Sequence, residues 1–313
     1  MAEANCVSNE KILSDIYNDR LPCLLSPITL RHLAREWLKE DTPNFDYGGF
    51  VVGEKPETSV ILLKSAGVLA GVPFVNAIFK ELDLEVEWFF KEGQRLEPIQ
   101  TVAAVTGKVR QLLLAERIVL NVLTRASGIA SLARELNFIA RSCRWDGEVA
   151  GTRKTTPGFR LVEKYALLAG GATTHRYDLS SMIMLKDNHI WTAGSITQAV
   201  KDAKIVGGFS HKIEVECRSL DEAQEAGTAG ADVIMLDNFT PEILISTSTE
   251  LKRQFPHVVI EASGGITKLN MADYCVPNVD VVSLGCLTQG YSVVDFSMKI
   301  QKDGKDPRNL PVH

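Results

Sequence analysis

The chain has 313 residues, of which 45% are hydrophobic and 23% charged, and its formal net charge is −5. This length exceeds the core of most single domains, so two folding units are expected. No apolar run approaches the roughly 18 residues of a membrane span. A net negative charge also argues against general nucleic-acid binding, which depends on phosphate neutralisation. We therefore predict neither a membrane nor a nucleic acid as a partner, and any anionic ligand needs a local basic cluster.

The six cysteines show neither CxxC nor Cys/His spacing, and the first residues contain no apolar signal core. Both features favour a reducing compartment, and we predict a cytoplasmic protein. Residues 1–25 are polar and weakly periodic, and we interpret them as a partly ordered extension.

The elements expected after this extension form a first α+β unit. Leucines and a tryptophan recur at helical spacing over residues 28–38, and a second apolar helix is expected over 74–82. Short β-branched or aromatic runs predict strands, and these cover residues 59–65, 84–90 and 101–107. Residues 109–127 are apolar at helical spacing but are interrupted by charges, including Glu116 and Arg117, which indicates a helix with buried or interfacial charge.

After residue 145, short apolar runs recur, each ending in polar or glycine residues. They cover residues 148–154, 182–188, 211–217, 232–238, 258–265 and 279–285. Helix-compatible segments separate most of them, so the pattern predicts repeated βα units and a parallel α/β barrel. In such a barrel the polar ends of the strands meet at one mouth, where the chemistry is expected. The alternating run at 291–300 predicts a strand that returns to the first unit, followed by a loose tail over 303–313.

A basic cluster lies in residues 151–190, which contain six Lys or Arg and three Asp or Glu and so carry +3, against −8 for the rest of the chain. Guanidinium and ammonium groups match carboxylate and phosphate oxygens, so the cluster indicates an anion site. The alternative is a solvated, salt-bridged surface. Arg153, Lys154 and Lys186 follow apolar strands, which places them at the predicted mouth.

Two carboxylates, Glu216 and Asp237, end successive predicted strands. Oxygen ligands of this kind suit Mg²⁺, which completes its coordination with water and substrate phosphate. The alternative is that each carboxylate pairs with a nearby Lys or Arg. Glu214 alternates with Glu216, and alternation alone does not say which of the two faces the mouth.

Glycine turns follow the last two predicted strands, at ASGGI (262–266) and SLG (283–285). Glycines let backbone N–H groups approach phosphate oxygens, and barrels commonly bind phosphate at this position. Ordinary turn glycines are the alternative. The acidic pair followed by TGG that binds ribose phosphate in many phosphoribosyltransferases does not occur. His175 beside Arg176 could polarise a substrate or serve as a structural hydrogen bonder.

At GTRKTTPGFR (151–160), THRYDLSSMIMLKDNHI (174–190), IEVEC (213–217), DVIMLDNF (232–239) and EASGGI (261–266), the sequence resembles the quinolinate phosphoribosyltransferases, also called carboxylating nicotinate-nucleotide pyrophosphorylases. The similarity extends from about Ile28 to Lys299 and includes GVLAG (67–71), EWFFKEG (87–93) and LLLAER (112–117). One departure is Gly227, which stands in a helix-like stretch where a better helix former is expected.

The resemblance implies an α/β fold with an N-terminal α/β sandwich domain and a C-terminal incomplete, roughly six-stranded α/β barrel. The corresponding division is an extension (1–25), the sandwich (26–127), the catalytic barrel (128–290), and a returning strand with a tail (291–313). It also implies a head-to-tail homodimer with shared active sites, able to assemble further into a hexamer. Quinolinate and phosphoribosyl pyrophosphate would be the substrates, with Mg²⁺ as cofactor.

The family's site residues carry over onto matching positions of this chain. The resemblance implies catalytic roles for Lys154, Lys186, Glu216 and Asp237, with the last two near Mg²⁺ through substrate or water. It implies substrate binding by Arg117, Thr152, Arg153, His175, Arg176, Ser263, Gly264, Gly265 and Gly285. In such enzymes the arginine of the AER motif, here Arg117, reaches into the neighbouring subunit's site.

Two other readings stay open. A Schiff-base aldolase would use a lysine at a strand end, such as Lys186 or Lys212, as its nucleophile. A non-catalytic scaffold would keep the fold and bind phosphate without turnover.

Overall fold

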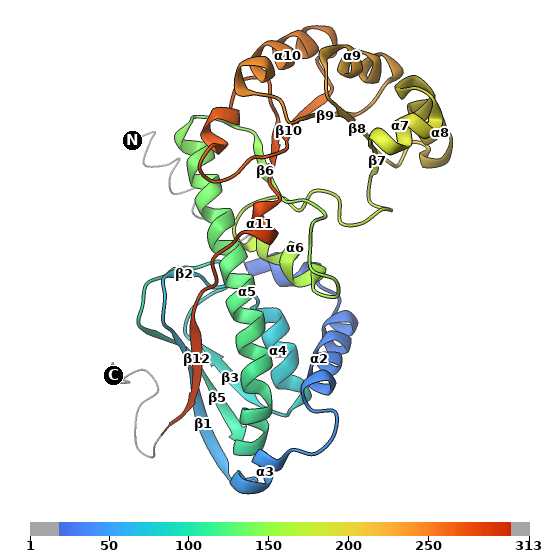
Figure 1. Cartoon of the computed structure of the whole chain (residues 1–313). Helices are drawn as coiled ribbons and strands as arrows, with labels where there is room; N and C mark the ends of the chain where they lie inside the picture. The colour runs from blue at the N-terminus through green and yellow to red at the C-terminus, as the bar shows by residue number, and fades with distance from the viewer. Residues whose placement is uncertain (1–18, 302–313) are drawn as a thin grey trace. The chain divides into compact units, whose positions relative to one another are not determined.

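The computed structural model describes residues 19–301 of the chain (Figure 1). The predicted tail at 303–313 and most of the predicted extension lie outside these residues. Contacts divide the chain into two compact units. Of the described residues, the first unit contains 19–132, Leu161–Gly170 and 292–301, and the second contains Ala133–Arg160 and Gly171–Tyr291.

The first unit is built on a four-stranded antiparallel sheet in the order β12-β1-β5-β3 (Figure 1). Its strands are β1 (Pro56–Leu63), β3 (Glu85–Trp88), β5 (Gln100–Lys108) and β12 (Phe296–Ile300), and a small second sheet pairs β2 (Gly67–Val68) with β4 (Arg95–Leu96). Because β12 pairs with β1, a strand from late in the sequence completes the sheet beside its first strand. Alternate residues of that segment, Val294, Phe296 and Met298, are buried.

The helices of the first unit are η1 (Leu21–Leu24), α2 (Pro27–Asp41), α3 (Tyr47–Val52), α4 (Val72–Glu81), α6 (Arg160–Ala169) and the start of α5 (Val109–Ser142). Phe74 of α4 packs between Trp37 of α2 and Tyr165 of α6, with ring centroids 6.4 and 5.5 Å away. Through this contact α6 packs in the first unit, although its residues lie within the range predicted for the barrel domain (128–290). The expected boundary between residues 127 and 128 falls inside α5, which is continuous across it.

The second unit is a six-stranded parallel sheet in the order β6-β11-β10-β9-β8-β7. Its strands are β6 (Glu148–Ala150), β7 (Ile183–Leu185), β8 (Ile213–Cys217), β9 (Val233–Asp237), β10 (Val259–Ser263) and β11 (Val281–Ser283). The last strand along the chain pairs with the first, while β6 and β7 form the two edges. The sheet is therefore an incomplete barrel, as the resemblance implied.

Helices follow the strands on the outside of this sheet, and α8, α9 and α10 form an arc around it in Figure 1. The helices are α7 (Asp187–Ala193), α8 (Ile196–Gly207), α9 (Leu220–Ala229), α10 (Pro241–Gln254), η2 (Met271–Tyr274) and α11 (Cys286–Gln289). Ser195 and Ser219 cap the first turns of α8 and α9 by accepting backbone N–H groups. Such caps fix where each helix begins, and so fix the length of the segment that precedes it.

The glycine at position 227 has a packing reason. A Cβ on Gly227 would lie 2.6 to 2.9 Å from three atoms of the Phe255 ring. Close packing of α9 against the residue that ends α10 therefore accounts for a poor helix former within α9.

Candidate active site

A cavity of about 240 Å³ opens at the carboxyl ends of the parallel strands in the second unit. Its lining is mostly charged or polar and comes from successive strand ends, as expected for a barrel mouth. The residues are Thr152, Arg153, Lys154, His175, Arg176, Met184, Lys186, Glu216, Met235, Asp237, Ser263, Gly264 and Ser283. Ten of the residues predicted from the sequence thus lie around one cavity.

Cationic and anionic groups meet on one side of the cavity, at the ends of β7, β8 and β9. The Lys186 Nζ forms a short ion pair with Glu216 Oε2. Asp237 follows on the next strand, and burial together with the negative charge of Glu216 raises the pKa of Asp237. Two carboxylates at the ends of adjacent strands offer oxygen donors that suit a divalent cation.

Two guanidinium groups, those of Arg153 and Arg176, line the same cavity and repel one another. Burial and then the positive charge of Arg153 lower the pKa of Arg176. A bound anion would relieve this repulsion, which supports the interpretation of the basic cluster as an anion site. The cluster is smaller than the sequence suggested, because Lys164 is buried in α6 and the Arg160 Nε donates to Thr155 Oγ1 over 3.0 Å.

The glycine turns after β10 and β11 have the backbone freedom that a phosphate site requires. Gly264 and Gly265 have φ of +93° and +63°, in the left-handed region that side chains disfavour. A Cβ on Gly285 would lie 3.2 Å from Lys154 Cδ, so this glycine lets the lysine chain pass close to the backbone. The Thr288 Oγ1 also donates to the Lys154 carbonyl over 2.6 Å. Gly265 and Gly285 are not among the residues that line the cavity.

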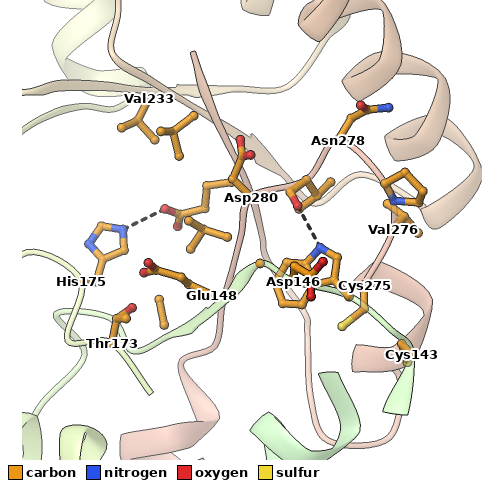
Figure 2. A pocket seen from close by; sticks show the side chains of 18 of the residues that line it. Cys143, Asp146, Glu148, Thr173, His175, Val233, Cys275, Val276, Asn278 and Asp280 are labelled. Atoms are coloured by element: carbon orange, nitrogen blue, oxygen red, sulfur yellow. Dashed lines mark hydrogen bonds and ion pairs between the residues drawn. The ribbon is translucent and has the colours of Figure 1, made fainter. Parts of the chain in front are cut away.

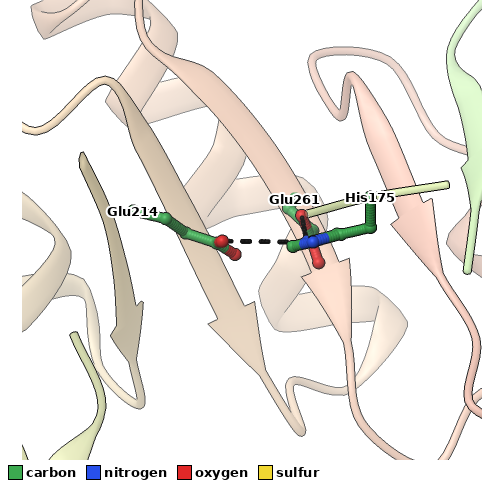
Figure 3. A group of neighbouring side chains, drawn as sticks. All are labelled: His175, Glu214 and Glu261. Carbon is green, nitrogen blue, oxygen red and sulfur yellow. Dashed lines mark hydrogen bonds and ion pairs between the residues drawn. The ribbon is translucent and has the colours of Figure 1, made fainter. Parts of the chain in front are cut away.

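His175 lies at the base of the cavity, with the left-handed φ of +56°. Its Nε2 is 3.0 Å from Glu261 Oε2 and 3.7 Å from Glu214 Oε2, which come from β10 and β8 (Figure 3). Burial opposes the charge of the ring, but the two carboxylates outweigh it and raise the His175 pKa to about 9. The Arg176 amide donates to Nδ1 over 2.7 Å, so in this geometry only Nε2 carries a proton. A second proton, on Nδ1, would break the hydrogen bond from the Arg176 amide. This cost opposes the stabilisation of the charged ring by the two carboxylates.

Glu214 and Glu216 lie at different depths on β8. Glu216 lines the cavity, whereas Glu214 lies two residues deeper on the same face of β8 and is fully buried. Burial raises the pKa of Glu214. Met184 and Met235, which the sequence analysis did not name, stand two residues before Lys186 and Asp237, so strand alternation could have found them.

Two residues that the sequence analysis proposed for a site, Lys212 and Arg117, do not line this cavity. Lys212 precedes β8 and lies at its amino end, so it does not share the mouth with Lys186, and its proposal as a Schiff-base nucleophile at that mouth is wrong. Arg117 is an exposed residue of α5 in the first unit. Its expected role concerns a second subunit and stays a prediction.

Parallel strands with a cationic mouth, paired carboxylates and glycine turns define a barrel enzyme that acts on phosphorylated, anionic substrates. The family models for the N-terminal and C-terminal domains of quinolinate phosphoribosyl transferase match residues 32–127 and 129–299. The chain belongs to the quinolinate phosphoribosyltransferase family.

Individual relatives agree with this assignment. The chain is 52% identical over 280 residues to the human nicotinate-nucleotide pyrophosphorylase [carboxylating], covering 90% of this chain and 94% of that protein. It is 49% identical to the protein of the same name from Dictyostelium discoideum, covering 89% and 98%. The solved nicotinate-nucleotide pyrophosphorylase from Francisella tularensis superposes with a TM-score of 0.82 at 31% identity, covering 88% of this chain and 98% of that one.

Proposed function

We propose that this chain transfers the phosphoribosyl group of phosphoribosyl pyrophosphate to quinolinate in the cavity of the second unit. The products are nicotinate mononucleotide, pyrophosphate and carbon dioxide, and the chain is a carboxylating nicotinate-nucleotide pyrophosphorylase. The observation that carries the proposal is the set of four cationic side chains and two carboxylates around one cavity: Arg153, Lys154, Arg176, Lys186, Glu216 and Asp237.

Quinolinate carries two adjacent carboxylates, and the site offers two neighbouring guanidinium groups. Arg153 and Arg176 are suited to bind these carboxylates, because a planar fork of N–H donors matches carboxylate oxygens. Thr152 and His175 line the same cavity and complete this half of the site. The left-handed backbone at His175 keeps the ring and the following arginine in fixed directions.

The phosphoribosyl donor takes the remaining groups. Lys154 and Lys186 meet the charge of the leaving pyrophosphate, and the turn of Ser263, Gly264 and Gly265, with Gly285 next to Lys154, accommodates the 5′-phosphate. Bringing two anionic substrates together is costly, and these cations lower the repulsion while they set the angle of attack.

The pyridine nitrogen of quinolinate attacks C1 of the ribose while the bond from C1 to pyrophosphate breaks. Positive charge develops on the ribose in the transition state, and a carboxylate at the ends of β8 or β9 stabilises it. The alkylated pyridinium then loses its 2-carboxylate as carbon dioxide, and the electron pair left on C2 is stabilised by the adjacent cationic nitrogen until it takes a proton. The substrate is its own electron sink, so no covalent enzyme intermediate is required.

The carboxylates of Glu216 and Asp237 also fit a divalent cation. They are oxygen donors on adjacent strands at the mouth, and the charge of one already raises the pKa of the other. Mg²⁺ held there would neutralise the charge of the pyrophosphate leaving group. Lys186 pairs with Glu216, and we expect this lysine to turn to the pyrophosphate when the donor binds.

We further propose that the enzyme acts as a homodimer in which Arg117 of one subunit completes the site of the other, with a hexamer as a further assembly. The test is complementation. Arg117→Ala and Lys186→Met should each be nearly inactive alone, whereas random mixing into dimers leaves one intact site in half of them and restores about a quarter of the wild-type activity. No recovery after mixing would refute the shared site.

Within residues 19–301 no helix could cross a membrane, and the cytoplasmic location stays a prediction.

The decisive assay uses purified protein with quinolinate, phosphoribosyl pyrophosphate and Mg²⁺, and measures nicotinate mononucleotide and carbon dioxide, with nicotinate as the control acceptor. Product formed from quinolinate but not from nicotinate supports the proposal, whereas product formed from nicotinate contradicts it. Phosphate binding without turnover would favour a scaffold. Borohydride trapping with a carbonyl substrate would reveal a Schiff base at Lys186 and favour an aldolase.

A further inference from the structure

A buried chain of hydrogen bonds runs beneath the active-site cavity. The Glu261 carboxylate contacts His175 Nε2 through Oε2, over 3.0 Å, and accepts from Ser283 Oγ through Oε1, over 2.6 Å. Ser283 Oγ is in turn 2.9 Å from Ser263 Oγ. The chain therefore begins at the residue next to Arg176, in the half of the site assigned to quinolinate, and ends at the glycine turn assigned to phosphate.

Glu261 does not line the active-site cavity, although His175, Ser263 and Ser283 all do. It is only 2% exposed, and it contacts His175 and Ser283 directly, whereas Ser263 is linked to it through Ser283. On its other side lies a larger cavity of about 810 Å³ at the amino ends of the strands (Figure 2). Since His175 lines both cavities, the pair of His175 and Glu261 forms part of the wall between them.

The single proton of each serine hydroxyl shows how binding in one half of the site can affect the other half. A hydroxyl has one proton, and the shorter contact assigns that of Ser283 to Glu261, so its oxygen accepts from Ser263. A phosphate that draws the Ser263 proton to itself weakens this last bond. A charged acceptor at the centre makes each remaining bond stronger than a neutral one.

We propose that Glu261 is a positioning residue that holds the two substrate half-sites in register. It keeps the imidazole of His175 facing the quinolinate half and the hydroxyl of Ser283 facing the phosphate turn. The inference rests on the proposed function, because the two half-sites are named by the substrates assigned to them.

Glu214 offers a matched comparison within the same barrel. It is a second buried carboxylate beside His175, with Oε2 3.7 Å from Nε2. Among the described residues neither of its oxygens has a hydrogen-bond partner, and nothing links it to Ser283. If Glu261 acts through its two bonds, replacing the Glu214 carboxyl with an amide leaves the phosphate half unaffected.

The experiment compares Glu261→Ala, Glu261→Gln and Glu214→Gln with the wild type. It measures kcat, the KM of each substrate at saturation of the other, and the affinity for each substrate alone by calorimetry. Losing a charged hydrogen bond costs about 1.5 to 3 kcal/mol, so Glu261→Ala should raise both KM values by about ten- to a hundredfold. Glu261→Gln keeps one acceptor oxygen and should recover most of this loss, while Glu214→Gln should leave the KM of phosphoribosyl pyrophosphate within about twofold of the wild-type value.

A rise in only one KM, or a fall in kcat with both KM values unchanged, would overturn the inference. If Glu261→Ala does not fold, Ser283→Ala decides, because it lies in the phosphate half and the inference requires it to raise the KM of quinolinate as well. If the wild type gives no nicotinate mononucleotide, the proposed function fails. The calorimetric affinities then still test the link, because equal affinities of wild type and variant for both substrates would refute it.

Discussion

The two glycines of the turn after β10 give a sharp test of the site, because they are adjacent and both have a left-handed φ, but the space around an added Cβ differs. A Cβ on Gly264 would lie 2.4 Å from Asn238 Oδ1 and 2.8 Å from the Asn238 backbone nitrogen, whereas a Cβ on Gly265 meets nothing within 4 Å. That nitrogen donates to the Ser263 carbonyl over 2.9 Å and joins the turn to the end of β9. Backbone cannot yield as a flexible side chain can, so Gly264→Ala must strain this junction.

The expected magnitudes follow from these contacts. A left-handed conformation costs an alanine about 1 to 2 kcal/mol, which both substitutions incur. Overpacking adds about 1 to 3 kcal/mol at Gly264 alone, so Gly264→Ala should destabilise the protein by about 2 to 5 kcal/mol. Gly265→Asn should be milder than Gly265→Ala, because asparagine tolerates the left-handed region.

The assay is urea unfolding of the variants side by side, with the KM of phosphoribosyl pyrophosphate measured under folded conditions. Gly264→Ala should raise this KM because the shifted turn no longer matches the phosphate, and Gly265→Ala should raise it less. Equal loss of stability in the two alanine variants would show that strain alone acts and would refute the assigned role of the Asn238 contact.

Three further predictions concern charged groups. Lys186→Met should lower kcat/KM by about 10²- to 10³-fold, as expected when one electrostatic stabiliser is removed, and steady-state kinetics measures this. Asp237→Asn should raise the Mg²⁺ concentration needed for half-maximal activity, in a titration of metal-stripped enzyme. Burial raises the pKa of Glu92 from 4.5 to about 8 although it accepts the Gly71 and Val72 amides, so its folded state holds a proton that the unfolded state has lost. The stabilisation from Glu92 should therefore fall as pH rises from about 4.5 to about 8, and pH-dependent unfolding of Glu92→Gln should lack this fall.

Much of the second unit could be predicted because a strand buried on both faces has a simple signature. Each apolar run ends in a polar residue at the mouth, so Lys186, Glu216 and Asp237 could be assigned to one site from the sequence alone. The same signature does not identify contacts made by helices. The position of α6 depends on the edge-to-face contact between Phe74 and Tyr165, two rings far apart in the sequence.

Gly227 shows a second limit. Helix propensity counts a glycine as a defect, but propensity describes an isolated helix, and α9 packs on Phe255 too closely for a side chain. The sequence signal for such a contact lies 28 positions further along the chain and has no local pattern. For this reason the sequence indicates that Gly227 departs from a good helix, whereas the packing of α9 requires a glycine at this position.

The network around His175 marks the deepest limit of prediction from the sequence. Strand alternation puts Glu214 and Glu216 on one face of β8, and Glu261 and Ser263 on one face of β10. Alternation does not give depth, and depth separates their roles: Glu216 and Ser263 reach the cavity, while Glu214 and Glu261 lie one layer below and meet the same histidine. That layer places two buried carboxylates beneath a cluster of cations, an arrangement that costs free energy unless hydrogen bonds offset it. Only Glu261 has those bonds, and they lead to both halves of the site, which is why we assign the positioning role to Glu261 rather than to Glu214.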